Sequence, residues 1–518
     1  MSETFYITTA IDYVNGAPHL GHAYEKVITD VIARSRRSLG REVFFLTGLD
    51  EHGQKVQQAA AAEGRDPQAY CDDLAVAWKA MAARLDLTHD DFIRTTEERH
   101  RSTVQTLLAK LHREGRFTTG TYEGWYSYKE ETFLTEKDRL PDGTFPAVYG
   151  DVTPLTERNY FFPLREHQEW LIQHLEDHPE FIQPDFRRNE VLGFLRSETL
   201  EDLCISRPKS RLSWGITLPF DTDYVTYVWF DALTNYISVP AARGDPGITG
   251  ILGLPGIAGA PSLWPAVHVI GKDILKFHAV YWPIMLRVAG IPLPRQILAH
   301  GWWQKDGQKL SKSTGNVVDP MAVIDEWGVD AFRYYVTREL DLGADGNWTD
   351  AGFAARYQAE LANGLGNLVN RSLKMLVSYR AGRVPRPSGD LQAEARAAVQ
   401  ATREAYDGFR LQGALQATWE LVTRANKFVE ETAPFKMAKD PAKAARLDEV
   451  LYALVETCRI LAVMLWPVIP GTSARIYQQL GLETAPDRWV STEWGGLAEG
   501  HAVREPQALF PRKDLAKP

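Results

Sequence analysis

The sequence predicts an α/β fold up to about Gly352 and an all-α bundle beyond it. The first observation is a strand-like run, Phe5–Ala10, followed by an amphipathic helix pattern and a second strand-like run, Glu42–Gly48. Such a βαβ unit is typical of a parallel sheet. The second is a stretch rich in Tyr, Phe, Trp, Gly and Pro, residues 115–215, which predicts an inserted, irregular or β-rich subdomain. The third is the dominance of Ala, Leu, Arg and Glu after Gly352, which predicts a helical bundle.

The first helix is predicted to begin at Leu20. Ala23, Val27 and Val31 recur every four positions and therefore share one face of a helix, and Gly40 ends the pattern.

Past the insert, Tyr224–Phe230 and Ala266–Ile270 are predicted as buried strands, with the Gly/Pro-rich segment Gly244–Pro261 as a long surface loop between them. The last twenty residues contain Pro506 and Pro511 and are predicted to form a loose tail. The domains expected are 1–114 and 221–320 (two halves of one α/β domain), 115–220 (the insert), 321–351 (a connecting segment), 352–500 (the bundle) and 501–518 (the tail).

Composition narrows the class of protein. The chain is 44% hydrophobic and 24% charged, with a net charge of -9, which argues against a protein coated with basic residues for non-specific nucleic-acid binding. Cys71, Cys204 and Cys458 are far apart, which favours a reducing compartment, and we expect the cytoplasm. No secretory or transit signal is evident, and the apolar run Ile460–Ile469 is too short to span a bilayer, so no membrane partner is expected.

The tetrapeptide His19-Leu20-Gly21-His22 directly follows the first strand and begins the first helix. The N-terminus of a helix presents unpaired N–H groups and the positive end of the helix dipole, both of which suit phosphate groups. Gly21 would let a flat ring approach the backbone. The alternative is two unrelated surface histidines beside a helix cap.

A second motif, Lys309-Leu310-Ser311-Lys312-Ser313, lies nearly three hundred residues later. Two lysines on a short loop can neutralise a triphosphate and the pyrophosphate that leaves it. A solvated polar loop is the alternative for the motif alone. Together with the histidine motif it predicts two halves of a fold that close on ATP.

The two motifs are the signature sequences of class I aminoacyl-tRNA synthetases, which this chain resembles. Further segments resemble methionyl-tRNA synthetases in particular, in order from about Phe5 to about Pro470. They are Ala10–Gly16, Thr47–Gly53, Tyr227–Ala232 and Ile270–Ile274. The resemblance implies a split Rossmann-type parallel-sheet catalytic domain with an inserted connective subdomain, followed by an all-α anticodon-binding bundle.

The resemblance also implies a ligase that joins L-methionine to tRNA(Met), initiator and elongator. Methionine would attack the α-phosphate of ATP, give methionyl-adenylate and pyrophosphate, and pass to the 3′-terminal adenosine. His19, His22, Lys309 and Lys312 would be catalytic, and ATP would be bound by these four with Gly21 and Ser311. Mg²⁺ would lie on the pyrophosphate oxygens, and no general base is needed because a carboxylate is already ionised.

For methionine the resemblance implies eight contact residues: Ile11, Tyr13, Asp50, Trp229, Ala232, Tyr236, Ile274 and His278. Asp50 would hold the ammonium group, while Tyr13 and a neutral His278 could donate weak hydrogen bonds to sulfur. The alternatives are core packing for Trp229 and Tyr236, a helix cap for Asp50, and a metal held by Asp50–Gly53.

In the bundle, Asn367 and Arg371 match positions that read the anticodon in the family, and Phe435 stands where the family usually has tryptophan. A surface Asn/Arg pair and a core Phe are the alternatives.

Many relatives hold zinc through cysteines in the insert, but Trp125–Glu131 contains none, so no structural zinc is expected. No segment resembles an appended dimerisation domain, and a monomer is expected. The rival functions are another class I enzyme, such as a cysteine-activating one, and a non-catalytic RNA-binding paralogue.

Overall fold

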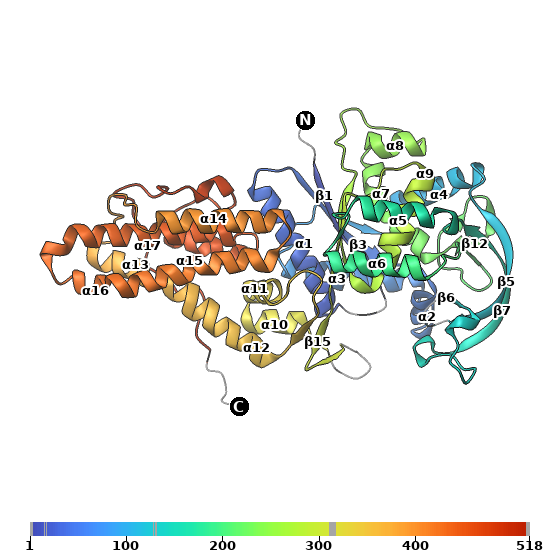
Figure 1. Cartoon of the computed structure of the whole chain (residues 1–518), viewed down its shortest axis with the longest axis horizontal. Coiled ribbons are helices and arrows are strands. Elements are labelled where there is room, and N and C mark those ends of the chain that lie inside the picture. The colour runs from blue at the N-terminus through green and yellow to red at the C-terminus, as the bar shows by residue number, and fades with distance from the viewer. Residues whose placement is uncertain are drawn as a thin grey trace.

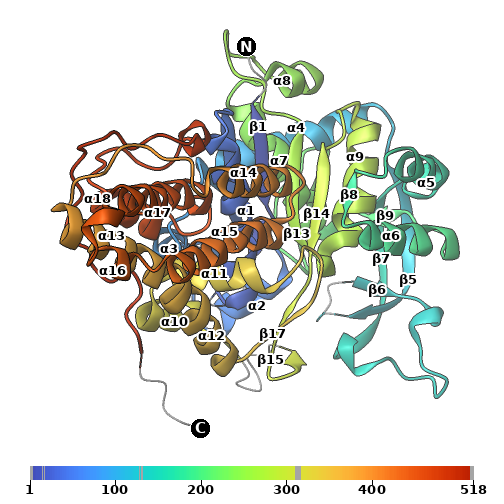
Figure 2. The same cartoon turned by 60° about the vertical axis from the view of Figure 1, so that its left-hand side comes forward.

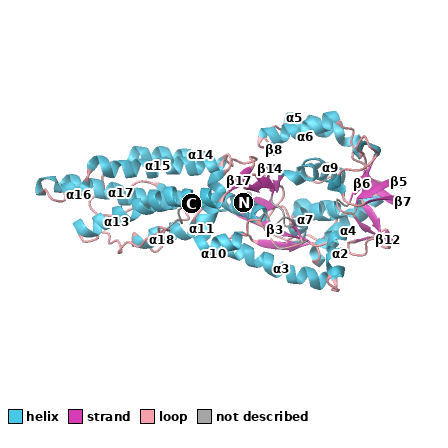
Figure 3. Ribbon diagram, turned by 90° about the horizontal axis from the view of Figure 1, so that it is seen from below, coloured by secondary structure: helices cyan, strands magenta, loops and turns pink. Residues whose placement is uncertain are grey.

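The computed structural model describes residues 4–513 except 15, 17, 128, 130, 131 and 310–316. Figure 1 shows an elongated molecule with an α/β unit in the centre, an antiparallel hairpin at one end and a helical bundle at the other. The predicted α/β fold followed by a helical bundle is confirmed. Seen from below in Figure 3, the bundle is made of helices and the strands lie in the rest of the molecule.

The centre of the α/β unit is a parallel sheet. Among the described residues its strands run in the order β2-β3-β1-β13-β14-β8, and β4 (Asp91–Arg94) pairs with β3. The strands are β1 (Phe5–Thr9), β2 (Asp12–Tyr13), β3 (Val43–Asp50), β8 (Ile182–Gln183), β13 (Ala266–Gly271) and β14 (Gln296–His300). Every residue of β1 is buried, as expected for a strand covered on both faces. The predicted strands near Phe5, Glu42 and Ala266 are confirmed.

Helices cover the sheet on both faces (Figures 1 and 2). The predicted first helix is α1 (Leu20–Ser38), and it packs on β1 and β3. On the other side of the sheet, α4 (Glu98–Arg113) packs against α7 (Val228–Ala242), and α9 (Trp282–Ala289) follows β13.

The insert is β-rich, as predicted. Its main sheet is antiparallel in the order β6-β5-β7-β9, formed by β5 (Thr118–Ser127), β6 (Thr132–Leu134), β7 (Val152–Phe162) and β9 (Leu203–Cys204). A smaller sheet holds β10 (Ser206–Pro208), β11 (Thr217–Leu218) and β12 (Asp221–Thr226).

Helices within the insert were not predicted. They are α5 (Gln168–Asp177) and α6 (Asp185–Ser197), and between them β8 returns to the edge of the parallel sheet beside β14. The aromatic and turn residues around these short helices obscured their amphipathic pattern, in which Leu171 and Leu175 are the buried residues of α5.

Two further predictions were wrong. Tyr224–Phe230 is not one strand, because β12 ends at Thr226 and α7 begins at Val228. The loop Gly244–Pro261 contains the helix α8 (Pro246–Leu252), which Asp245 caps and after which Gly253 takes a left-handed conformation.

The second sequence motif begins on a small sheet. Here β15 (Trp303–Lys305) pairs with β16 (Gln308–Lys309) and with β17 (Gly346–Trp348). The rest of the motif, Leu310–Ser313, lies outside the described residues.

The bundle follows α10 (Pro320–Trp327), α11 (Val329–Glu339) and α12 (Asp350–Arg356). It comprises α13 (Asn367–Arg380), α14 (Gln392–Asp407), α15 (Leu411–Thr432), α16 (Pro434–Met437), α17 (Ala444–Leu465) and α18 (Pro470–Gln479). The predicted loose tail is wrong as far as residue 513. Leu509 and Phe510 are buried there, and the Tyr357 hydroxyl donates to the carbonyl of Pro511 (2.9 Å).

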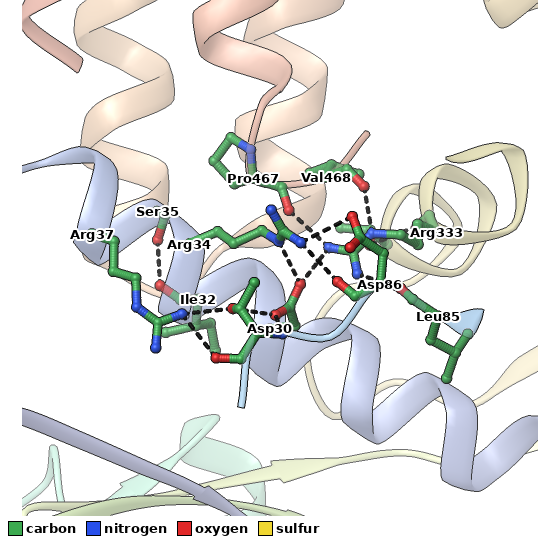
Figure 4. A network of polar contacts seen from close by, with 12 residues as sticks. Asp30, Ile32, Arg34, Ser35, Arg37, Leu85, Asp86, Arg333, Pro467 and Val468 are labelled. Carbon is green, nitrogen blue, oxygen red and sulfur yellow. Dashed lines mark hydrogen bonds and ion pairs between the residues drawn. The ribbon is translucent and has the colours of Figure 1, made fainter. Parts of the chain in front are cut away.

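A buried polar junction joins the sheet to the bundle (Figure 4). Arg333 on α11 is fully buried and donates to Asp30 of α1 (2.7 Å) and to the carbonyl oxygens of Val468 (2.8 Å) and Pro467 (3.0 Å), just beyond α17. Arg34 also donates to Asp30 (2.8 Å). Burial acts to raise the pKa of Asp30, whereas the guanidinium groups of Arg333 and Arg34 act to lower it. The guanidinium groups prevail, and the pKa lies below the usual value.

Candidate active site

A cavity of about 580 Å³ opens at the carboxyl ends of β1, β3, β13 and β14. It collects eleven of the residues that the sequence singled out: Ile11, Tyr13, His19, Gly21, His22, Asp50, Trp229, Ala232, Tyr236, Ile274 and His278. They come from four separate stretches of the chain. Of the lysine motif, the backbone of Lys309 lies in β16, and Ser311 and Lys312 lie outside the described residues. Since Trp303 and Gln304 of β15 line the cavity, this hairpin starts at its rim.

The two histidines of the first motif cap α1. Nδ1 of His19 accepts from the N–H of Gly21 (3.1 Å), and Nδ1 of His22 accepts from the N–H of His19 (3.2 Å). Their rings stack with centroids 3.7 Å apart. A ring whose Nδ1 accepts a hydrogen bond carries its proton on Nε2, so each neutral ring has one N–H donor at that atom. A Cβ on residue 21 would lie 3.1 Å from Cε1 of His19, so any larger residue there would crowd that ring.

Aromatic residues form another part of the cavity wall. Trp229 stacks on Phe277 with centroids 3.7 Å apart and an interplanar angle of 6°. Trp229, Ala232 and Tyr236 lie on one face of α7, since they are three and four residues apart. This face presents flat and apolar surface to a ligand.

His278 cannot act as a donor to sulfur, contrary to the sequence prediction. Its Nδ1 lies 3.0 Å from the carbonyl of Ile274, and its Nε2 lies 2.7 Å from the hydroxyl of Tyr236. A carbonyl only accepts, so Nδ1 carries the proton and Nε2 accepts from Tyr236. Burial lowers the pKa of His278 to about 4, so the ring is neutral as expected, but its one N–H is already used.

A buried group of charges at the cavity was not foreseen. The Lys26 ammonium donates to the Ala10 carbonyl (3.0 Å) and contacts Asp12 (2.9 Å) and Glu25 (3.0 Å). The other Glu25 oxygen faces Nε2 of His300 (3.1 Å). Burial raises the pKa of Asp12 to about 7 despite Lys26. Glu25 lies three residues after His22 and therefore on the same face of the predicted helix. This spacing was the signal in the sequence that Glu25 would lie near the histidine motif.

The side chains of Asp50, Glu51 and His52, at the end of β3, do not converge on one point. Asp50 is buried at the cavity, Glu51 accepts from Arg94 (2.6 Å), and His52 contacts Asp231 (2.7 Å). Within the described ranges, no group of three or more His, Cys, Asp or Glu side chains is arranged to hold a metal ion. The three neighbouring side chains therefore serve different partners.

In the insert, a guanidinium group lies over two neighbouring aromatic rings. Arg139 is 4.7 Å from the ring centroid of Trp125 and 5.0 Å from that of Phe145. We expected aromatic packing in place of a metal, and the cation over the two rings was not foreseen. The absence of zinc stays a prediction.

The three bundle residues lie on two helices, α13 and α16. Asn367 begins α13, and Arg371, one turn later, pairs with Glu430 on α15 (2.8 Å). Phe435 on α16 is 41% exposed, which is unusual for a large apolar ring, so it is not the core residue of the alternative interpretation.

Comparisons with known proteins agree with this fold. A family model described as "tRNA synthetases class I (M)" matches residues 5–153 and 146–373, and one described as "Anticodon binding domain of methionyl tRNA ligase" matches residues 380–514. The parallel sheet, its insert, the histidine motif at the sheet edge and the helical bundle thus define a class I aminoacyl-tRNA synthetase.

Individual relatives narrow this class. The methionine–tRNA ligase of Caldanaerobacter subterraneus subsp. tengcongensis is 41% identical over all of this chain and 80% of its own length. That of Bacillus subtilis is 40% identical over 99% of this chain and 78% of its own length. The structure of Mycobacterium tuberculosis methionyl-tRNA synthetase in complex with methionyl-adenylate is 40% identical, with a TM-score of 0.91 over 98% of this chain and 100% of that one. Its apo form is 37% identical, with a TM-score of 0.85 over 99% of each chain.

The chain belongs to the methionyl-tRNA synthetase family, and its function is that of a methionine–tRNA ligase. In the part of the chain that the structure describes, no helix is long and apolar enough to cross a membrane.

Proposed function

We propose that the cavity holds methionine at its aromatic wall and ATP at the N-terminus of α1. The observation that carries this proposal is the meeting of Asp50, Trp229 and the His19/His22 pair around one cavity, although they come from distant parts of the chain. A carboxylate, a stacked indole and two N–H donors suit an ammonium group, a thioether and phosphate oxygens respectively.

In the first step, a carboxylate oxygen of methionine attacks the α-phosphorus of ATP. The bond from that phosphorus to the bridging oxygen breaks, and pyrophosphate leaves with the electron pair. The Nε2–H groups of His19 and His22 stabilise the charge on the phosphate oxygens, while Lys309, Ser311 and Lys312 hold the phosphates. Mg²⁺ bound together with the nucleotide would supply further positive charge.

In the second step, the 3′-terminal adenosine hydroxyl of tRNA(Met) attacks the carbonyl carbon of the adenylate, and AMP leaves. We propose that Phe435 stacks on an anticodon base and that Asn367 and Arg371 contact neighbouring bases, in initiator and elongator tRNA alike. The exposure of Phe435 supports this role, because the ring is accessible to a base. Such a base–aromatic stack contributes about 1–3 kcal/mol. We further propose that the enzyme works in the cytoplasm, as a monomer, without structural zinc.

Pyrophosphate exchange tests the amino-acid site. Methionine should exceed cysteine, leucine and isoleucine by at least about 100-fold in kcat/KM, and comparable rates with cysteine would contradict the proposal. Asp50→Asn should raise KM for methionine. Asp73→Asn is the matched control, because Asp73 is exposed on the surface of α3 (Pro67–Arg84), where it pairs with Arg65.

Lys312→Ala tests the lysine motif. Adenylate formation should fall severely, while methionine binding, measured by calorimetry without ATP, should stay nearly intact. An unchanged exchange rate in this variant would refute the role given to the loop.

A further inference from the structure

Behind the methionine wall, one buried carboxylate is shared by two histidines. The Asp231 side chain is 1% exposed, and its two oxygens contact Nδ1 of His52 and Nε2 of His100, both at 2.7 Å. Burial alone would raise the pKa of Asp231, but the two histidines outweigh it and lower the pKa to about 2. Asp231 is thus a charged acceptor with both oxygens occupied. We name Asp231, His52 and His100 the Asp231 cluster.

Asp231 lies on the back of the helix that forms the wall. Trp229, Ala232 and Tyr236 of α7 line the cavity, whereas Asp231 and Ser238, seven residues apart, point to the other side. On that side α4 packs against α7, and Ser238 lies 2.9 Å from Nδ1 of His100. None of the α4 residues lines the cavity.

His52 connects the cluster to a different element. It follows Asp50, the last residue of β3, by two positions, and its ring also packs against Trp214 (5.4 Å). The contact between His52 and Asp231 therefore ties the end of β3 to the first turn of α7. These two elements carry Asp50 and Trp229, the residues to which we assign the ammonium group and the side chain of methionine.

We propose that Asp231 and His52 are positioning residues for methionine: their contact sets the spacing between Asp50 and Trp229. Neither side chain is among those that line the cavity, so neither touches the substrate. His100 holds the same carboxylate from α4 and supports the fold without setting that spacing. The inference rests on the proposed methionine site.

Two variants that remove one hydrogen bond each from the same carboxylate separate these roles. His52→Ala should raise KM for methionine in pyrophosphate exchange by at least about tenfold and leave KM for ATP within about twofold. His100→Ala should lower the melting temperature by a similar amount but leave KM for methionine within about threefold. His52→Asn should restore most of the methionine affinity, because its side-chain amide can donate from near the position of Nδ1.

Equal changes in KM for methionine in His52→Ala and His100→Ala, or an unchanged KM in a folded His52→Ala, would overturn the proposal. If His52→Ala does not fold, the comparison of His52→Asn with His52→Gln decides, since glutamine carries its amide one bond further from the backbone. Asp50→Asn and Trp229→Ala, measured in parallel, test the methionine site itself. If these two raise KM and His52→Ala does not, the spacing role alone fails; if they do not, the proposed site fails.

Discussion

Arg333 is expected to be the most costly single side chain to remove at the boundary between the sheet and the bundle. Its guanidinium group is fully buried and makes four hydrogen bonds: to Asp30, and to the carbonyl oxygens of Leu85 (2.9 Å), Pro467 and Val468. Arg333→Met keeps most of the side-chain volume and removes every donor. Three carbonyl oxygens then lose a donor in a region that water does not reach.

The structure sets the size of the effect. Breaking a buried ion pair by removing one partner costs about 3–5 kcal/mol. Asp30 keeps Arg34 (2.8 Å) and two donors from Thr88 (2.7 and 2.6 Å), so its charge is not left alone. The deprived carbonyl groups add to the cost. We therefore expect Arg333→Met to lower the free energy of unfolding by about 3–5 kcal/mol.

Urea unfolding followed by tryptophan fluorescence measures this loss. Arg165→Met is the matched control, because Arg165 pairs with Glu201 at the surface, where both side chains are more than half exposed. Exposed pairs contribute about 0–1 kcal/mol, so this variant should unfold almost like the parent. In the double variant Asp30→Asn/Arg333→Met the loss should be smaller than the sum of the two single losses. A loss below about 1 kcal/mol in Arg333→Met, or one equal to that of Arg165→Met, would refute the reasoning.

Three further outcomes are expected. The pKa of His278 is about 4 in the folded chain and about 6.5 in the unfolded chain, so the unfolded chain takes up the proton first as the pH falls. The folded state therefore has its full stability with respect to this group above pH 6.5 and loses about 3 kcal/mol as the pH falls toward 4. His278→Gln should lose that part of the pH dependence in urea titrations at stepped pH, and an unaltered profile would contradict the assignment. Phe435→Ala should raise KM for tRNA(Met) about tenfold or more and leave methionine-dependent pyrophosphate exchange unchanged. The control Val490→Ala, at an exposed apolar residue after α18, should change neither quantity. Equal effects of the two substitutions would rule out the stack. Metal analysis of the purified enzyme should find less than about 0.1 zinc per chain, and treatment with a zinc chelator followed by Mg²⁺ should leave the melting temperature unaltered; stoichiometric zinc would disprove the expectation.

Local signals in the sequence were sufficient for the elements that carry the site. The fully buried β1 and the capped start of α1 at His19 follow from short-range patterns, and these place the histidine motif at the sheet edge. Where the outcome depends on distant partners, the sequence was insufficient. Leu509 and Phe510 look like tail residues until the bundle covers them. His278 looks like a donor until Ile274 and Tyr236 occupy its ring nitrogens.

The unforeseen charges have the same explanation. Lys26, Asp12 and Glu25 are ordinary polar residues in a linear sequence, and they become a buried cluster because β1 and α1 fold back beside β14. A buried ammonium with three acceptors compensates for its lost hydration, and no periodicity in the sequence reveals that compensation. The family resemblance supplied the residues proposed to contact the substrate, but not the buried residues that pack around them.

One helix connects the reaction centre with the bundle. The first turn of α1 lies at the cavity, while Arg36 in its last turn donates to the carbonyl of Asp407 on α14 (2.9 Å), and Asp30 contacts Arg333 between them. The 19 residues of α1 span about 28 Å. The helix has no proline or glycine in its middle, where a kink would form. Rotation of the bundle against the sheet would therefore require α1 to bend or the buried Asp30–Arg333 contact to break, and if the predicted cost of breaking that contact is found, we expect the two domains to move as one unit.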